Sequence, residues 1–484
     1  MEKSSDWKTT PVRAAIRKRN ALRREVKTKR REWLEACKDA REAIKKAKEE
    51  SWREVVEGAI NESDERKVWQ FIKSLNGSLD TNSPNEVMKH NGKIISSNRK
   101  KADLFAQHYA GVSRLTFSRE EREINRRLKK LLESGSVGDE SCKDFTLAEL
   151  KKAIAKMKRK GAPGPDDIPP SFLKELGPKA LSELLEIFNL SFSSADCPQI
   201  WRNAIIVPLL KAGKPPSQMG SFRPVSLTSC VVKLLERLIA ERLYYMAETK
   251  GWFSGLQAGF RKGRSCEDQI LRIVQAIEDG FQQKPMRRSV LVLLDYSKAY
   301  DKVWREKLLL SMAEKGVPLQ YIRWLYSFLQ NRQARVRYAN TISTSKTMRQ
   351  GLPQGSVQSP LLFLFYINNL AEILPDTATI AMFADDVSIL AINNIREEAE
   401  KTAQQIVDTV VEWSSRWKLT LNAEKSESSF FSTWNKEAKW RPTITIEGKI
   451  IPSTESSRLL VVVFDCQLSF HKHVGNVCKE PLQN

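Results

Sequence analysis

The chain has 484 residues, of which 41% are hydrophobic, as in an ordinary globular protein with a large core. Its 80 Lys and Arg residues exceed its 58 Asp and Glu residues by 22, and such a surplus favours a polyanionic partner. The N-terminus lacks the apolar core of a signal peptide, and no apolar stretch is long enough to span a bilayer. The seven cysteines show no CxxC pair, which favours reduced thiols. We therefore expect no membrane association and a localisation in nucleus and cytoplasm.

Residues 1–80 predict a basic helical arm, since residues 11–75 contain few helix breakers. The first fifty residues hold 17 Lys and Arg against 9 Asp and Glu, a net charge of +8. Two interpretations remain open: an arm that binds nucleic acid, or a solvated helix whose tryptophans dock on the main domain. Residues 81–144 are expected to form a linker or N-terminal extension.

From residue 145 onward, helical and strand patterns alternate densely. Short strands are predicted at 205–210 and 289–297, a hairpin at 333–348 and a buried helix at 359–374. Apolar residues at steps of three and four predict an amphipathic helix that covers a sheet: Ile395, Ala399, Ala403, Ile406, Val410, Trp413 and Trp417. Long helices with few strands indicate an α+β fold, with helices behind an antiparallel sheet.

Three aspartates follow or join apolar strands. Asp295 ends the run "LVLLD", and Asp385 and Asp386 occupy the tip of the hairpin "TIAMFADDVSILAI". If these strands are neighbours, the carboxylates converge, and their repulsion requires cations. Carboxylate oxygens suit Mg²⁺, and two such ions are the usual device for nucleotidyl transfer. Adjacent strand residues face opposite sides, so we expect Asp385 to matter more than Asp386; the alternative is a pair of ordinary turn residues.

Basic and glycine-containing segments accompany these aspartates. The stretch "RQGLPQGSVQSPLLF" (349–363) is a loop that leads into a helix and allows close backbone approach to a nucleotide. Lys211 and Arg223 lie near a predicted strand and suit the binding of a triphosphate.

Taken together, the segments resemble the successive motifs of reverse transcriptases from non-LTR (LINE-type) retrotransposons. The similarity runs in the family's order from about residue 145 to 465. Its segments are "GAPGPDDIP", "WRNAIIVPLLKAGKP", "SFRPVSLTSCVVKLLERLI", "QAGFRKGRSCEDQIL", "LLDYSKAYDKVWREKLL", "RQGLPQGSVQSPLLF", "FADDVSIL" and "LTLNAEKSE". The resemblance implies a right-hand polymerase with fingers at 145–285, a palm with an antiparallel sheet at 286–470 and a short C-terminal tail at 471–484.

The resemblance also implies residue roles. Asp295, Asp385 and Asp386 would hold two Mg²⁺ ions, with Mn²⁺ as a substitute, and Lys211 and Arg223 would hold the triphosphate. The remaining nucleotide-site residues would be Tyr300, which excludes a ribose 2′-hydroxyl, and Gln354 and Gly355, which line the base and sugar. Lys425 would donate a proton to pyrophosphate, or is an exposed lysine on a turn. Asp301 is expected to form a salt bridge at a helix start.

The implied function is RNA-directed DNA polymerase, with an RNA template, a DNA primer or target and deoxynucleoside triphosphates as partners. Endonuclease activity would come from another chain. The alternative is a catalytically inert remnant that keeps the fold and binds nucleic acid.

Several family positions are altered. Asp167 replaces a glycine, Gln358 occupies a normally apolar site, and "SSRLLVVVFD" lacks the glycine of the Tyr-Leu-Gly turn. The residues beyond the palm leave little room for a thumb. We expect strain at the altered turns, a largely absent thumb and a truncated element copy.

Overall fold

The computed structural model describes residues 10–23, 29–61, 88–90, 93–134, 143–375, 378–437 and 439–479. The chain divides into two compact units, Met1–Ser83 and Pro84–Asn484. Within the described ranges, every helix is too short or too polar to cross a lipid bilayer.

The first unit contains two helices, α1 (Thr10–Arg23) and α2 (Arg30–Asn61), which pack against each other. Small buried side chains such as Val12, Ala36 and Ala40 permit the close approach. Both helices lie within the range predicted as a helical arm, and the part of that range beyond residue 61 lies outside the described residues. Helix α1 carries five Arg and Lys side chains and no acidic residue, whereas α2 mixes both charges. Both interpretations of the arm stay predictions.

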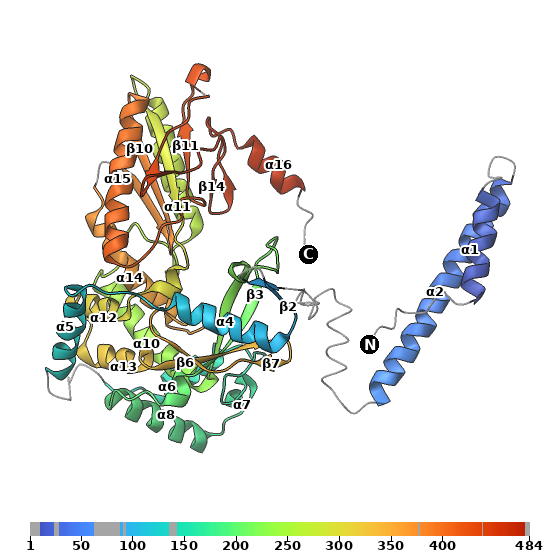
Figure 1. The fold of residues 1–484 in the computed structure, drawn as a ribbon, viewed down its shortest axis with the longest axis horizontal. Helices are drawn as coiled ribbons and strands as arrows, with labels where there is room; N and C mark the ends of the chain where they lie inside the picture. The colour runs from blue at the N-terminus through green and yellow to red at the C-terminus, as the bar shows by residue number, and fades with distance from the viewer. Residues whose placement is uncertain are drawn as a thin grey trace. The chain divides into compact units, whose positions relative to one another are not determined.

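The second unit contains an antiparallel four-stranded sheet, which we call the site sheet. Its strands, in spatial order, are β11 (Glu427–Phe431), β5 (Arg288–Leu294), β10 (Asp386–Asn393) and β9 (Thr379–Phe383). Helix α15 (Arg396–Arg416) covers one face and α11 (Cys266–Gln282) the other (Figure 1). Alternate residues of β5 pack into the hydrophobic cores on the two faces of the sheet. Val290 and Val292 face α15, and Leu291 faces α11. Burial on both faces fixes the register of β5.

A five-stranded sheet, the second sheet, lies in the same unit. Its strands are β4 (Phe222–Thr228), β3 (Ala204–Leu210), β6 (Arg332–Tyr338), β7 (Thr341–Ile342) and β8 (Lys346–Met348). Strands β3 and β6 are parallel, and the other pairs are antiparallel. Helix α4 (Asn98–Val112) packs on β6 through the fully buried Phe105. Part of the segment predicted as a linker is therefore a packed helix.

The remaining elements surround the two sheets. The α-helices among them are α5 (Glu121–Glu133), α6 (Leu147–Ala155), α7 (Pro170–Lys174), α8 (Pro178–Ser193), α9 (Gln199–Arg202), α10 (Cys230–Thr249), α12 (Arg305–Glu314), α13 (Leu319–Leu329), α14 (Ser359–Ile373) and α16 (His471–Lys479). The 3₁₀ turns are η1 (Met219–Ser221), η2 (Ala299–Lys302) and η3 (Asn435–Glu437). Their strands form the hairpins β1 (Met88–His90) with β2 (Lys93–Ile95), β12 (Thr445–Ile446) with β13 (Lys449–Ile450) and β14 (Arg458–Leu459) with β15 (Val462–Val463). The α+β class and the antiparallel sheet predicted from the sequence are confirmed.

The two sheets do not follow the ranges predicted for fingers and palm. Strands β6 to β8 fall within 286–470 but pair with β3 from 145–285. Conversely, α11 falls within 145–285 but packs on the site sheet. Long-range strand pairing, which local patterns do not encode, decides both placements.

The altered family positions coincide with unfavourable local features. Asp167 has φ of 54° and Leu460, in the turn between β14 and β15, has φ of 53°. Aspartate tolerates this left-handed conformation, whereas for leucine it costs about 1 kcal/mol or more. The Gln358 side chain is fully buried, and its Oε1 has no hydrogen-bond partner in the described part of the chain.

Replacing Leu460 by glycine tests this strain. Leu460→Gly should raise the free energy of unfolding by about 0.5 to 1 kcal/mol, because relief of the left-handed strain exceeds the added entropy of the unfolded chain. The measurement is denaturant unfolding of the two proteins. Leu459→Gly, which deletes a side chain that is 3% exposed, should destabilise the protein instead. Equal destabilisation by both changes would contradict the presence of backbone strain at Leu460.

Candidate active site

The site sheet brings the predicted carboxylates to one end. The register pairs Val387 with Leu294, so Asp295, the next residue after β5, lies opposite Asp386, the first residue of β10. Asp385 lies in the two-residue turn that joins β9 to β10. Opposed residues of an antiparallel pair have Cα atoms about 5 Å apart. The backbone thus places the three aspartates side by side.

Asp385 and Asp386 nevertheless line different hollows. Asp295 and Asp385 line a cleft of about 440 Å³, which we call the main cleft. Asp295 and Asp386 line a neighbouring hollow of about 190 Å³. This division follows from strand alternation, which turns successive side chains to opposite faces. The main cleft therefore receives two of these three carboxylates directly.

The electrostatics of these carboxylates are unfavourable within the protein alone. Burial raises the pKa of Asp385, and the charge of Asp295 raises it further. Burial, Asp385 and Asp295 together raise the pKa of Asp386 to about 6. Asp295 Oδ2 is buried and accepts no hydrogen bond from any described residue; the Nζ of Lys425 lies 3.5 Å away. Such an arrangement favours the binding of a cation.

The donor set fits a hard divalent cation with few protein ligands. Across the described ranges, no group of three or more His, Cys, Asp or Glu side chains is arranged so that it could hold a metal ion. Two carboxylates in an open cleft, one with an unpaired oxygen, suit Mg²⁺, which retains water and binds substrate phosphates as further ligands. The residues present therefore fit Mg²⁺ better than a structural metal.

Cationic side chains line the same cleft. Lys211 follows β3 and Arg223 belongs to the adjacent strand β4, and both line the main cleft. The Lys211 Nζ donates to the Gly220 carbonyl over 3.3 Å. Burial lowers the pKa of Lys211, and the nearby Lys425 and Arg223 lower it further. Removal of this mutual repulsion by a bound polyanion would be favourable.

Tyr300 forms an aromatic wall of the main cleft. It belongs to η2, just after Asp295, and stacks on Phe363 with ring centroids 4.5 Å apart and an interplanar angle of 13°. Its hydroxyl is buried without a hydrogen-bond partner among the residues that the structure describes. Burial raises the pKa of Tyr300, and the nearby charge of Asp385 raises it further, so the hydroxyl stays neutral.

The loop before α14 closes the main cleft. Its Gln354 carbonyl accepts from the Ser226 N–H over 2.6 Å, which joins the loop to β4. Gly355 has φ of +125°, and a Cβ there would lie 2.4 Å from the Ser226 carbonyl oxygen, so only glycine fits. The side chain of Gln354 donates to Asp301 Oδ1 over 2.9 Å. Gln354 is thus among the residues that line the main cleft.

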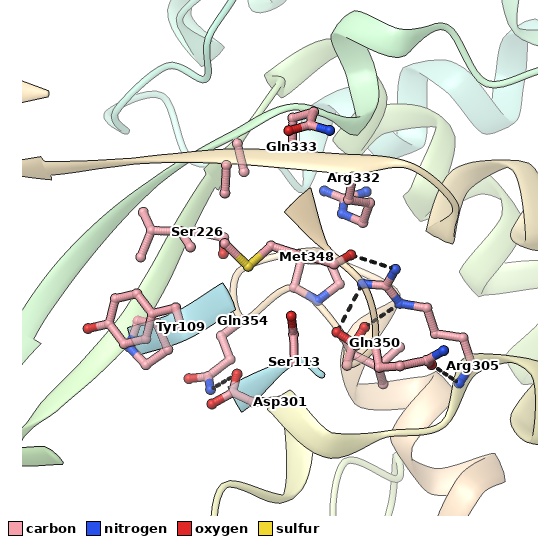
Figure 2. A pocket seen from close by; sticks show the side chains of 17 residues that line it. Tyr109, Ser113, Ser226, Asp301, Arg305, Arg332, Gln333, Met348, Gln350 and Gln354 are labelled. Atoms are coloured by element: carbon pink, nitrogen blue, oxygen red, sulfur yellow. Dashed lines mark hydrogen bonds between the residues drawn. The ribbon is translucent and has the colours of Figure 1, made fainter. Parts of the chain in front are cut away.

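The salt bridge predicted for Asp301 is wrong. Asp301 lines the main cleft, accepts its hydrogen bond from Gln354 and forms no ion pair with any described residue. The reason is its half-buried position beneath the loop, where the amide of Gln354 rather than a cationic side chain reaches its carboxylate. Figure 2 shows Asp301 and Gln354 facing each other at the rim of a small cavity of about 50 Å³.

Sequence reasoning missed the residue that holds this loop. Arg305, at the start of α12, is fully buried and donates to five backbone carbonyls. Figure 2 shows its side chain beside Met348 and Gln350. The acceptors are Leu329, Met348, Arg349, Gln350 and Gly351. Burial lowers the pKa of Arg305 to about 9. No local pattern distinguishes it from a surface arginine at a helix start.

Sequence reasoning also missed three residues of the main cleft, two of which, His108 and Tyr109, lie outside the recognised motifs. His108 and Tyr109 of α4 and Asn422 line the main cleft. The Asn422 N–H donates to the Asp295 carbonyl over 2.8 Å. Helix α4 lies far from the aspartates in the sequence, and only its packing on the second sheet brings it there.

Residues 210–444 match the model of the family described as reverse transcriptase (RNA-dependent DNA polymerase). The matched range includes the three aspartates, Lys211, Arg223 and Lys425. This part of the chain is therefore a reverse transcriptase domain.

Similar proteins narrow the class. Three relatives come from Drosophila melanogaster: the probable RNA-directed DNA polymerase from transposon BS, that from transposon X-element, and the RNA-directed DNA polymerase from mobile element jockey. They are 29%, 29% and 28% identical over 94%, 85% and 81% of this chain, and 50%, 44% and 43% of their own lengths. The predicted resemblance is confirmed: residues 210–444 match the reverse transcriptase family, and the chain is similar to RNA-directed DNA polymerases from Drosophila non-LTR elements. The chain spans about half the length of the curated relatives it matches.

The pH dependence of stability tests the buried Asp301. Burial raises its pKa from 3.8 to about 6, against the opposing hydrogen bond from Gln354. Protonation thus favours the folded state, so this carboxyl's contribution is complete below about pH 4 and is lost as the pH rises through 6. Asp301→Asn cannot ionise and should gain stability relative to wild type between pH 4 and 7, on the order of 2 kcal/mol.

The measurement is the unfolding midpoint of both proteins at several pH values. Asp408→Asn, on the exposed face of α15, is the matched control and should show no such trend. A difference between Asp301→Asn and wild type that stays constant with pH would refute the buried, titrating carboxyl.

Proposed function

We propose that the chain is an RNA-directed DNA polymerase that extends a DNA 3′-end along an RNA template. The observation that carries the proposal is the shared cleft of Asp295, Asp385, Lys211 and Arg223. Paired carboxylates beside two cations match a nucleoside triphosphate bound through divalent metal. In this proposal the site sheet is the palm, and the second sheet belongs to the fingers.

Asp295 and Asp385 would hold two Mg²⁺ ions, or Mn²⁺ in their place, and Asp386 would contribute from the neighbouring hollow. When bound, such ions activate a hydroxyl and stabilise negative charge on the transferred phosphoryl group. The carboxylates need no rearrangement, because β5 and β10 hold them in register.

The other residues would bind and orient the substrate. Lys211 and Arg223 would hold the triphosphate by charge-assisted hydrogen bonds, while Gln354 and Gly355 line the base and sugar. Lys425 has a side chain that is 57% exposed and an Nζ 3.5 Å from Asp295 Oδ2. It can therefore reach a leaving pyrophosphate and donate a proton to it. The basic run "KTKRR" at 27–31 supports access to the nucleus as well as the cytoplasm.

Loss of one carboxylate tests the reaction. Asp385→Asn should lower Mg²⁺-dependent incorporation on a primed RNA template by a factor on the order of a thousand or more, since metal stabilisation supplies several kcal/mol. Asp408→Asn is the control and should retain activity. The assay is primer extension by the purified chain.

Incorporation that survives Asp385→Asn would overturn the metal mechanism. A wild-type chain that incorporates nothing, yet binds RNA with strong salt dependence, would favour the inert nucleic-acid-binding remnant instead.

Substitution of Tyr300 tests whether its ring selects deoxyribonucleotides over ribonucleotides. Tyr300→Ala should admit ribonucleotides, because the missing ring leaves room for a 2′-hydroxyl; a shift of about tenfold or more corresponds to about 1.4 kcal/mol of lost discrimination. Tyr300→Phe keeps the ring and the stacking on Phe363, so it should discriminate as wild type does. The measurement is the ratio of kcat/KM for deoxynucleotides and ribonucleotides. An unchanged ratio in Tyr300→Ala would exclude this role.

A further inference from the structure

An irregular segment extends the site sheet beyond β9. The Ala258 N–H donates to the Met382 carbonyl over 2.9 Å, and the Met382 N–H donates to the Leu256 carbonyl over 3.0 Å. Gln257 forms a parallel bridge with Met382. Residues 256–259, which we call the edge segment, overlap the start of the stretch "QAGFRKGRS" (257–265), to which the proposed function assigns no role.

The side chain of Gln257 reaches the turn that carries Asp385. It is 1% exposed. Its Oε1 accepts from the N–H groups of Ala384 and Gly259, each over 2.8 Å, and its Nε2 donates to the Ala384 carbonyl over 3.2 Å. The amide thus pairs with both backbone groups of Ala384, the residue immediately before Asp385, as a neighbouring strand would.

The turn depends on such external partners. Ala384 has φ of 56°, a left-handed conformation that costs an alanine about 1 kcal/mol or more. Strained backbone of this kind persists where the surroundings determine it. A Cβ on Gly259 would lie 2.2 Å from the Ala384 nitrogen, so the edge segment touches the turn directly. Both residues therefore restrict where the Asp385 backbone can lie.

The edge segment is itself anchored. Arg261 donates to the carbonyls of Ser254 and Gln257 over 2.6 and 3.1 Å. Its side chain is 7% exposed and forms a two-pronged ion pair with Glu248 of α10 over 2.9 and 2.7 Å. A charge-assisted bidentate pair of this kind holds a segment firmly. The chain of contacts thus runs from α10 through Arg261 and Gln257 to the Asp385 turn.

We propose that Gln257 is a positioning residue for the metal-binding carboxylate: its side-chain amide fixes the Ala384 backbone and thereby holds Asp385 against Asp295. The inference rests on the proposed function, in which Asp385 binds a divalent cation. Positioning contacts behind a metal ligand affect metal affinity by about 10- to 100-fold.

The test compares two buried glutamines. Gln257→Met keeps the shape of the side chain but removes the amide; Gln320→Met does the same on α13, where the amide donates to backbone carbonyls of α8. The first readout is hydrogen–deuterium exchange in peptides that cover residues 380–386. The second is Mn²⁺ affinity by titration calorimetry, and thermal midpoints confirm that the compared variants are folded.

We expect Gln257→Met to accelerate exchange at the turn and to weaken Mn²⁺ binding about tenfold or more, while Gln320→Met changes neither. Gly259→Ala, which presses on Ala384 and leaves the amide in place, should weaken Mn²⁺ binding similarly and serves if Gln257→Met does not fold. Asp385→Asn should reduce Mn²⁺ binding without faster exchange at the turn.

Unchanged exchange and Mn²⁺ affinity in Gln257→Met, with a wild type that binds Mn²⁺, would overturn this inference alone. A wild-type chain that binds no Mn²⁺ would overturn the proposed function and the inference with it.

Discussion

Electrostatic repulsion between Asp295 and Asp385, both half-buried at one end of the site sheet, is the constraint on which the site depends. The antiparallel register of β5 and β10 enforces their proximity, and α15 and α11 hold that register by burying both faces of β5. Burial and the nearby charge of Asp295 raise the pKa of Asp385. The fold therefore places negative charge where a bound cation would stabilise it, and the basic side chains of Lys211 and Arg223 line the same cleft.

The surrounding side chains resist relaxation of this arrangement. Arg305 donates hydrogen bonds to five backbone carbonyls, four of them in residues 348–351 ahead of α14, and Gly355 brings the loop before α14 against β4. Gln257 holds the Asp385 turn in a similar way, through hydrogen bonds to the backbone of Ala384. Each of these residues acts on backbone rather than on substrate, so the cleft is fixed by hydrogen bonds that the folded chain already contains. Preorganisation of this kind keeps charged groups in place before a substrate arrives.

The convergence of Asp295 and Asp385 could be predicted from the sequence, because both aspartates lie at the ends of apolar runs that form strands. Strand alternation also separates Asp385 from Asp386, which line different hollows. Other features depend on contacts between distant segments: α4 beside the main cleft, the pairing of β6 with β3, and the roles of Arg305 and Gln257. The salt bridge expected for Asp301 failed for the same reason, since local sequence does not report that a loop buries it.

The most direct measurement of the central claim is the anomalous scattering of Mn²⁺ in crystals of the chain with a primed RNA template and a deoxynucleotide. If both aspartates bind the metal, an anomalous peak will lie within bonding distance of carboxylate oxygens from both Asp295 and Asp385, beside the triphosphate. A peak held by only one of these residues, or a triphosphate bound away from Lys211 and Arg223, would contradict the central claim.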